Sequence, residues 1–303
     1  MTLLVVGSVA LDSVETPFGK ADEVLGGSAT FFAASACNLT PVQVVGVVGD
    51  DYPVDKLKPL EKRGVDFAGL ERAKGRSFRW RGRYRHDLNV AETLETHLGV
   101  FSNFSPKIPA QFRNAPFVFL GNIDPRLQLD VLTQVDTPRL VACDTMNFWI
   151  ESRRPDLLKL LERVDAVTLN DGEARQLSET YNLMKAAKWI MKRGPRLVII
   201  KKGEHGAFMF TGDTVFFAPA YPLENVFDPT GAGDAFAGGF MGYLAKCGDI
   251  SDASLRRAVI YGSAMGSFAV EKFSIERLLE IDAKQLASRV GDFRRLVAFE
   301  DEL

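Results

Sequence analysis

The chain has 303 residues, of which 46% are hydrophobic and 25% are charged, and its formal net charge at pH 7 is −2. This balance is typical of a globular protein with a sizeable core, and it gives no electrostatic case for binding nucleic acid or an anionic membrane. No uncharged run approaches the ~20 residues of a membrane-spanning helix. Cys37, Cys143 and Cys247 are widely separated, with no Cys-x-x-Cys pair and no His-rich segment, so we expect no zinc or disulfide framework. We therefore expect a cytoplasmic protein that binds neither nucleic acid nor a membrane.

Short apolar, β-prone runs alternate with helix-like stretches along most of the chain. Strands are expected over residues 3–6, 42–48, 117–120, 140–142, 166–169 and 197–200, and late helices over 235–245, 251–273 and 283–295. Continuous apolar strands that alternate with helices predict a parallel sheet covered by helices. No internal repeat or long linker divides the sequence. We therefore expect one α/β domain over residues 1–303.

Two features near the amino terminus are candidates for substrate binding. Asp12 follows the first expected strand, and open α/β sheets bind ligands at the carboxyl ends of their strands. Its carboxylate could accept hydrogen bonds from paired hydroxyls, or it could be a turn or capping residue. The pair Gly26-Gly27 opens the first long helix, where it allows close backbone approach to a substrate or forms a simple turn with Ser28 as N-cap.

Segments 12–25 and 76–100 do not fit the strand–helix alternation. In the second, arginines alternate with aromatic residues, which places them on opposite faces of a strand; they are Arg79, Arg81, Arg83 and Arg85, with Phe78, Trp80 and Tyr84 between them. Three interpretations stay open. The aromatic face could pack within a small sheet while the arginines meet solvent or carboxylates, the arginines could contact an anionic substrate, or the stripe could bind nucleic acid.

Two strand ends in the second half carry polar residues. Asn170 to Glu173 has the pattern of a capping box at a helix start. The run from Lys201 through Lys202, Gly203 and Gly206 is typical of a tight turn after a strand, with Lys201 expected to face solvent.

The run from Phe227 to Phe236 is the most informative part of the sequence. Asp234 directly follows Gly231, Ala232 and Gly233 at an expected loop-to-helix junction. The free amides and the dipole of a helix start attract negative charge, and an adjacent aspartate can take a proton from a hydroxyl. Taken alone, the run could also be a turn with an N-cap aspartate. The functional interpretation is transfer of an anionic group, such as phosphoryl, to an alcohol.

Asp-Pro-Thr-Gly-Ala-Gly-Asp at 228–234, followed by Ala-Phe-Ala-Gly-Gly-Phe, resembles the C-terminal motif of the PfkB, or ribokinase-like, carbohydrate and nucleoside kinases. Similar motifs follow in family order along the whole chain. The resemblance implies an α/β fold, a ribokinase-like three-layer sandwich with a mostly parallel central sheet and a small β lid formed at about 12–25 and 76–100. It implies ATP-dependent transfer of the γ-phosphoryl group to a hydroxyl of a small sugar or sugar-like substrate, with Asp234 as general base and Gly231, Ala232 and Gly233 as anion hole.

The resemblance also implies roles for the other motifs. It implies ATP binding by Asn170, Lys202, Gly203, Gly206, Thr230 and Gly262, and magnesium binding, through water, by Glu173 and Asn170. It implies that Asp12, Gly26 and Gly27 hold the substrate hydroxyls. A monovalent cation such as K⁺ and a homodimer through the lid are further expectations.

One motif departs from the family pattern. Where the family has an asparagine shortly after the paired glycines, this chain has Thr30 or Phe31. A hydroxyl at Thr30 could contact the substrate, and Phe31 could stack on a sugar face or a base. The expected acceptor is therefore a sugar or sugar-like molecule, with a nucleoside as the first alternative. A non-catalytic sugar- or nucleotide-binding regulator is the remaining alternative, against which the intact Asp234 and Glu173 argue.

Overall fold

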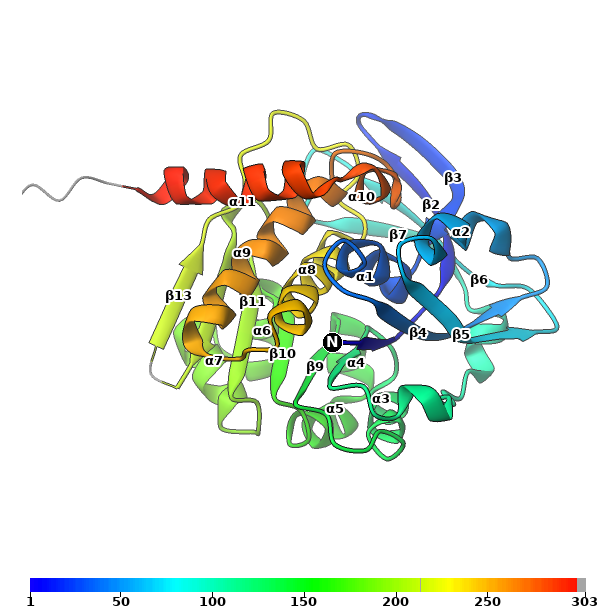
Figure 1. The fold of residues 1–303 in the computed structure, drawn as a ribbon, viewed down its shortest axis with the longest axis horizontal. Helices are drawn as coiled ribbons and strands as arrows, with labels where there is room; N and C mark the ends of the chain where they lie inside the picture. Colours follow the sequence, from blue (N-terminus) through cyan, green and yellow to red (C-terminus); the bar gives the residue numbers. More distant parts are fainter. Residues whose placement is uncertain (213, 299–303) are drawn as a thin grey trace, which may run out of the picture.

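The central layer of the protein is a sheet that runs through the whole molecule (Figure 1). A computed structural model describes residues 1–212 and 214–298. Among these residues the sheet has nine strands in the order β13-β12-β11-β10-β9-β8-β1-β4-β5. Their bounds are β1 Leu3–Val6, β4 Val42–Gly49, β5 Val65–Ala73, β8 Phe117–Leu120, β9 Leu140–Asp144, β10 Ala166–Asn170, β11 Leu197–Lys201, β12 Ala207–Thr211 and β13 Thr214–Ala218. Neighbours from β11 to β5 pair in parallel, whereas β12 and β13 are antiparallel.

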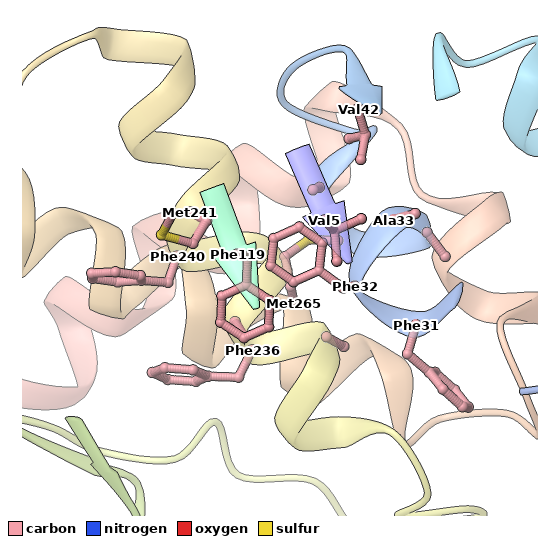
Figure 2. Close-up of a cluster of buried hydrophobic side chains, with 14 of the residues drawn as sticks. Val5, Phe31, Phe32, Ala33, Val42, Phe119, Phe236, Phe240, Met241 and Met265 are labelled. Carbon is pink, nitrogen blue, oxygen red and sulfur yellow. The ribbon is translucent and has the colours of Figure 1, made fainter. Parts of the chain in front are cut away.

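Helices cover both faces of this sheet, because alternate side chains of each buried strand point to opposite faces. In β1, Leu3 and Val5 belong to one buried cluster, and Leu4 and Val6 to the other. The first cluster, partly drawn in Figure 2, receives α1 (Ser28–Ala36), α8 (Ala232–Cys247), α9 (Asp252–Ala269), α10 (Glu276–Glu280) and α11 (Ala283–Val297). The second receives α3 (Pro125–Val131), α4 (Asn147–Ser152), α5 (Arg154–Leu161), α6 (Asp171–Ser178) and α7 (Leu183–Met191). The expected three-layer α/β sandwich is confirmed.

Shorter helices complete the described structure. They are α2 (Lys58–Glu61) and the 3₁₀ turns Val54–Leu57, Gly99–Asn103, Ala110–Phe112 and Gly203–His205. The helix expected over 251–273 ends at Ala269 instead, and the carbonyl of the C-cap residue Val270 accepts hydrogen bonds from the N–H groups of Phe227 and Asp228 at 2.8 and 3.3 Å. Within the described residues, no helix combines the length and apolar character needed to cross a bilayer.

A second sheet, here called the small sheet, is formed by the two segments that break the alternation. It has four strands among the described residues, in the order β3 (Gly19–Gly26), β2 (Ala10–Thr16), β6 (Phe78–Tyr84) and β7 (Ala91–His97). Its arginines are paired with carboxylates: Arg79 with Glu23 and Asp51, Arg81 with Glu95, Arg83 with Glu15, and Arg85 with Glu92. The first of the three interpretations of this stripe therefore fits the structure. Its charges are already compensated, which leaves little attraction for an anionic substrate or nucleic acid.

Candidate active site

The predicted general base, Asp234, lies in the first turn of α8, directly after a loop that ends at Gly231. Gly231 is the N-cap of α8 and has a φ of 73°, a left-handed conformation that glycine adopts without steric cost. A β-carbon at this position would also lie 2.2 Å from the ring of Phe31. Both the conformation and the available space therefore require glycine at the junction that positions Asp234.

The backbone N–H groups at this junction are those expected to form an anion hole, and this role stays a prediction. Those of Gly233 and Asp234 belong to the first turn of α8, where an α-helix supplies no acceptor. The N–H of Ala232 donates to the carbonyl of Pro229 at 3.2 Å, so it would have to exchange this contact to bind a ligand. Together with the helix dipole, the free amides suit the junction to an anion such as a phosphoryl group.

The carboxyl of Asp234 is half-buried next to other charged groups. Burial raises the pKa of Asp234 to about 7, and the negative charge of Asp144 raises it further, whereas the positive charge of Lys201 acts in the opposite direction. A carboxyl whose pKa lies near neutral pH is well matched to accept a proton from an attacking alcohol.

Lys201 lies in this site, and the expectation that it faces solvent is wrong. Its Nζ lies 2.9 Å from Oδ2 of Asp144, and the two side chains are only 17% and 7% exposed. A β-carbon on Gly233 would lie 2.9 Å from the same Nζ, so the ammonium group lies beside the anion hole. The hydroxyl of Thr168 donates to Oδ2 of Asp144 at 3.0 Å and helps to hold the carboxylate in place.

Strand periodicity accounts for the position of Lys201. Leu197 and Ile199 of β11 belong to the buried cluster beneath α8, and Lys201 is the next residue on that face. Burial acts to lower the pKa of Lys201, but the charges of Asp144 and then Glu173 outweigh it, so its pKa is raised and the side chain stays charged. The alternation is visible in the sequence, and it separates Lys201 from Lys202, which follows the strand.

Asn170 and Glu173 form the capping box that starts α6. Oδ1 of Asn170 accepts the N–H of Glu173 at 2.8 Å, and Oε2 of Glu173 accepts the N–H of Asn170 at 2.7 Å. Burial, followed by the charge of Asp144, raises the pKa of Glu173 to about 7. The capping role is thus present, and a role in metal binding stays a prediction.

Magnesium fits the charge balance of this region. The negative charge of Asp144 acts on Glu173, Asp234 and Lys201, so three carboxyl groups lie near one ammonium group. Within the described residues, no group of three or more His, Cys, Asp or Glu side chains is arranged to hold a metal directly. Because Mg²⁺ keeps several of its waters and is often bound mainly through substrate phosphates, the residues fit water-mediated binding of a metal–nucleotide complex.

Asp12 lies on the side of the site where the acceptor is expected to bind. Burial raises its pKa to about 7, the N–H of Gly27 opposes this, and the charges of Asp228 and Asp234 raise it further. A β-carbon on Gly26 would lie 2.0 Å from Oδ2 of Asp12, so only glycine leaves room for this carboxyl. The structure therefore brings Asp12 and the paired glycines together with Asp234.

The two residues at the departure from the family pattern are both buried. The ring of Phe31 is 2% exposed and lies against Gly231, which leaves almost no surface for a base to stack on. Figure 2 shows Phe31 and Phe32 leaving α1 in different directions, with Phe32 directed toward Phe119. The hydroxyls of Thr30 and Tyr52 are both buried and lie near each other, and the Thr30 hydroxyl opposes the rise in the pKa of Tyr52. Sequence reasoning missed Tyr52, whose pKa is raised by burial and by the charge of Asp12.

Of the remaining predicted nucleotide residues, Thr230 directly precedes Gly231, and the others lie in two places. Gly203 and Gly206 build a tight turn with φ values of 50° and 96°, closed by a hydrogen bond from the N–H of Lys202 to the carbonyl of Gly206 at 2.7 Å. Gly262 lies where α9 meets α8, and a β-carbon there would come within 2.9 Å of the carbonyl oxygen of Phe236. Close helix packing explains Gly262, and its contact with a nucleotide stays a prediction.

The chain is similar to known kinases over most of its length. Residues 11–281 match the family model of the pfkB family carbohydrate kinases. A cytidine kinase from Thermococcus kodakarensis is 31% identical over 247 residues, which cover 80% of this chain and 87% of that protein. The nucleoside kinase of Methanocaldococcus jannaschii has a similar fold, with a TM-score of 0.76, 20% identity, and 96% and 98% of the two chains covered. A putative ribokinase II from E. coli, solved with ATP and Mg²⁺, gives a TM-score of 0.78 at 18% identity, with 96% and 99% covered.

Proposed function

Because the chain belongs to the PfkB family of carbohydrate kinases, we propose that it transfers the γ-phosphoryl group of ATP to a hydroxyl of a neutral nucleoside or sugar, with a nucleoside as the first candidate. The observation that carries this proposal is the position of Asp234. Its half-buried carboxyl lies at the start of α8, where the charges of Asp144 and Lys201 act on it, and its own charge raises the pKa of Asp12.

In the proposed reaction, Asp12 accepts hydrogen bonds from hydroxyls of the acceptor and so orients it. Asp234 takes the proton of the attacking hydroxyl as its oxygen approaches the γ-phosphorus. The N–H groups of Gly231 and Gly233, that of Ala232 once it leaves the Pro229 carbonyl, and the ammonium of Lys201 then meet the negative charge of the transferring group. Magnesium, when bound with ATP, would neutralise further phosphate charge, and Glu173 and Asn170 are the residues proposed to orient its waters.

Two observations support a neutral nucleoside as the acceptor. Each arginine of the stripe at 79–85 is already paired with a carboxylate, which disfavours a phosphorylated acceptor. The similarity to a protein named cytidine kinase extends over 87% of that protein, which favours a nucleoside. A free sugar is the second candidate, because Asp12 and the paired glycines could equally hold the hydroxyls of ribose or fructose. K⁺ dependence and a homodimer through the small sheet stay predictions and do not enter the mechanism.

A panel of acceptors tests the proposal. Pyrimidine and purine nucleosides, free pentoses and hexoses, and sugar phosphates would each be supplied with Mg-ATP while ADP release is measured. We expect the highest kcat/KM with a nucleoside and no turnover above background with sugar phosphates. A free sugar as the best substrate would select the second candidate. Tight ATP binding without turnover on any acceptor would contradict catalysis and favour a binding regulator.

A further inference from the structure

The small sheet is tied to the loop that precedes the anion hole, residues 227–230, by contacts from both of its hairpins. Tyr84, the last residue of β6, is buried, and its phenolic oxygen accepts a hydrogen bond from the Thr230 hydroxyl at 3.3 Å. Thr16, the last residue of β2, donates from its hydroxyl to the carbonyl of Phe227 at 2.8 Å. Next to it, the rings of Phe18 and Phe227 lie 5.6 Å apart.

A third connection reaches the same loop from β3. The hydroxyl of Ser274 donates to the carbonyl of Leu25 at 2.5 Å, and its N–H donates to Oδ2 of Asp228 at 3.1 Å. Ser274 has a φ of 57°, a conformation that is unfavourable for a residue other than glycine and that these two hydrogen bonds help to maintain. Oδ1 of Asp228 accepts the N–H of Thr230 at 2.9 Å, so the contacts converge on Thr230.

Thr230 is the residue directly before Gly231, and its neighbour Tyr84 adjoins both ends of the site. Burial raises the pKa of Tyr84 to about 12, the Thr230 hydrogen bond opposes this, and the charges of Asp228 and Asp12 contribute further increases. The phenol of Tyr84 therefore lies near both Asp12, on the acceptor side of the site, and Asp228, in the loop before the anion hole. A shift of β6 would move Tyr84 away from Thr230. The junction that starts α8 would then change its conformation.

We infer that Tyr84 is a positioning residue, which acts through Thr230 to align the anion hole with the acceptor when the small sheet covers the site. This inference rests on the proposed kinase reaction. It makes phosphoryl transfer, as distinct from ATP binding, dependent on the position of the small sheet. Removal of the phenolic oxygen should leave the small sheet folded. It should make the alignment of the acceptor hydroxyl with the phosphoryl group less precise.

The test is a double-mutant cycle of Tyr84→Phe and Thr230→Val on the full chain, with Trp80→Phe as a matched control. Trp80 belongs to the same strand, but its indole N–H donates to Thr93 at 3.2 Å, inside the small sheet. We expect Tyr84→Phe to lower kcat about 5- to 30-fold, which converts to ~1–2 kcal/mol, with little change in the Kd of ATP. The double variant should be no worse than the poorer single variant, because both substitutions remove the same hydrogen bond. Trp80→Phe should keep kcat within about twofold, since its contact does not reach the 227–230 loop.

Amide hydrogen exchange gives a readout that does not depend on activity. In the native protein, the acceptor should slow exchange in both the small sheet and residues 227–234. In Tyr84→Phe, it should still slow exchange in the small sheet but no longer in the loop. Additive effects in the cycle, a Tyr84→Phe variant that behaves like Trp80→Phe, or unchanged loop protection would overturn the inference while leaving the kinase assignment intact. If Tyr84→Phe does not fold, Thr16→Val tests the second tether by the same measurements. Failure of every acceptor in the panel would instead overturn the proposed function.

Discussion

Lys201 and Asp144 form a buried ion pair, 2.9 Å long, between the ends of two strands that flank β10. The carboxyl ends of parallel strands are where ligands bind in open α/β sheets, and this pair lies at that edge beside Gly233. An ammonium group held there is already desolvated and aligned. A phosphoryl group at Gly233 would share this ammonium with Asp144, and the cost of burying the ammonium is already met in the folded protein.

Lys201→Met should therefore impair both folding and phosphate binding, with Lys188→Met, at an exposed lysine of α7, as the matched control. Removing Lys201 leaves Asp144 without its counter-charge near Glu173 and Asp234. We expect the free energy of unfolding to fall by about 3 kcal/mol and the Kd of ATP to rise at least about tenfold. Denaturant titration and calorimetric binding would measure the two effects. Equal losses in both variants would show that Lys201 has no special role.

Asp234→Asn should remove the proposed general base, because an amide does not accept the proton of the attacking hydroxyl, while ATP should still bind. General-base catalysis contributes a factor of about 10²–10⁴, so turnover should fall within that range. Because the pKa of Asp234 is raised to about 7, the native kcat/KM should fall about tenfold per pH unit below pH 7, where the carboxyl becomes protonated. The pH profile of the native enzyme and turnover of the variant measure these effects. Near-normal turnover in Asp234→Asn would remove Asp234 from the mechanism.

Sequence reasoning predicted the layers of the fold and the residues with strong local patterns. Apolar strand runs and the Gly231–Asp234 junction depend on neighbouring residues, and for these the local signal is sufficient. The pairing of Tyr84 with Thr230 joins positions 146 apart and leaves no pattern in either segment. The prediction for Lys201 is wrong although the periodicity of its strand is readable. Phe31 is buried against Gly231 because α1 packs on the start of α8. This packing of two distant helices cannot be read from a single sequence.

Asp12→Asn should stabilise the protein at alkaline pH while lowering its affinity for the acceptor. The folded-state pKa of Asp12 is raised to about 7 from 3.8, so between these values the folded state binds more protons than the unfolded state. Stability conferred through this group is therefore highest below pH 4 and is lost as the pH rises through 7, by up to about 4 kcal/mol. We expect the variant to unfold at a higher denaturant concentration than the native protein at pH 8, with a smaller difference at pH 4.5. If the variant were less stable than the native protein at pH 8, the buried carboxylate of Asp12 would not be destabilising and its pKa would not be raised by burial.

Gly231→Ala should destabilise the start of α8, with Gly291→Ala as a control. Position 231 has a φ of 73°, and its β-carbon would meet the Phe31 ring at 2.2 Å, whereas Gly291 lies in α11, where an added β-carbon would have no atom within 4 Å. We expect Gly231→Ala to lower the free energy of unfolding by about 1–3 kcal/mol and to reduce kcat, because the anion-hole amides shift. Gly291→Ala should be neutral or should stabilise α11 by up to about 1 kcal/mol, since alanine is the better helix former. Thermal unfolding and turnover of both variants measure the contrast. If the two variants had the same stability and the same kcat, the Phe31 ring would have to move aside at little cost. Glycine would then not be required at position 231.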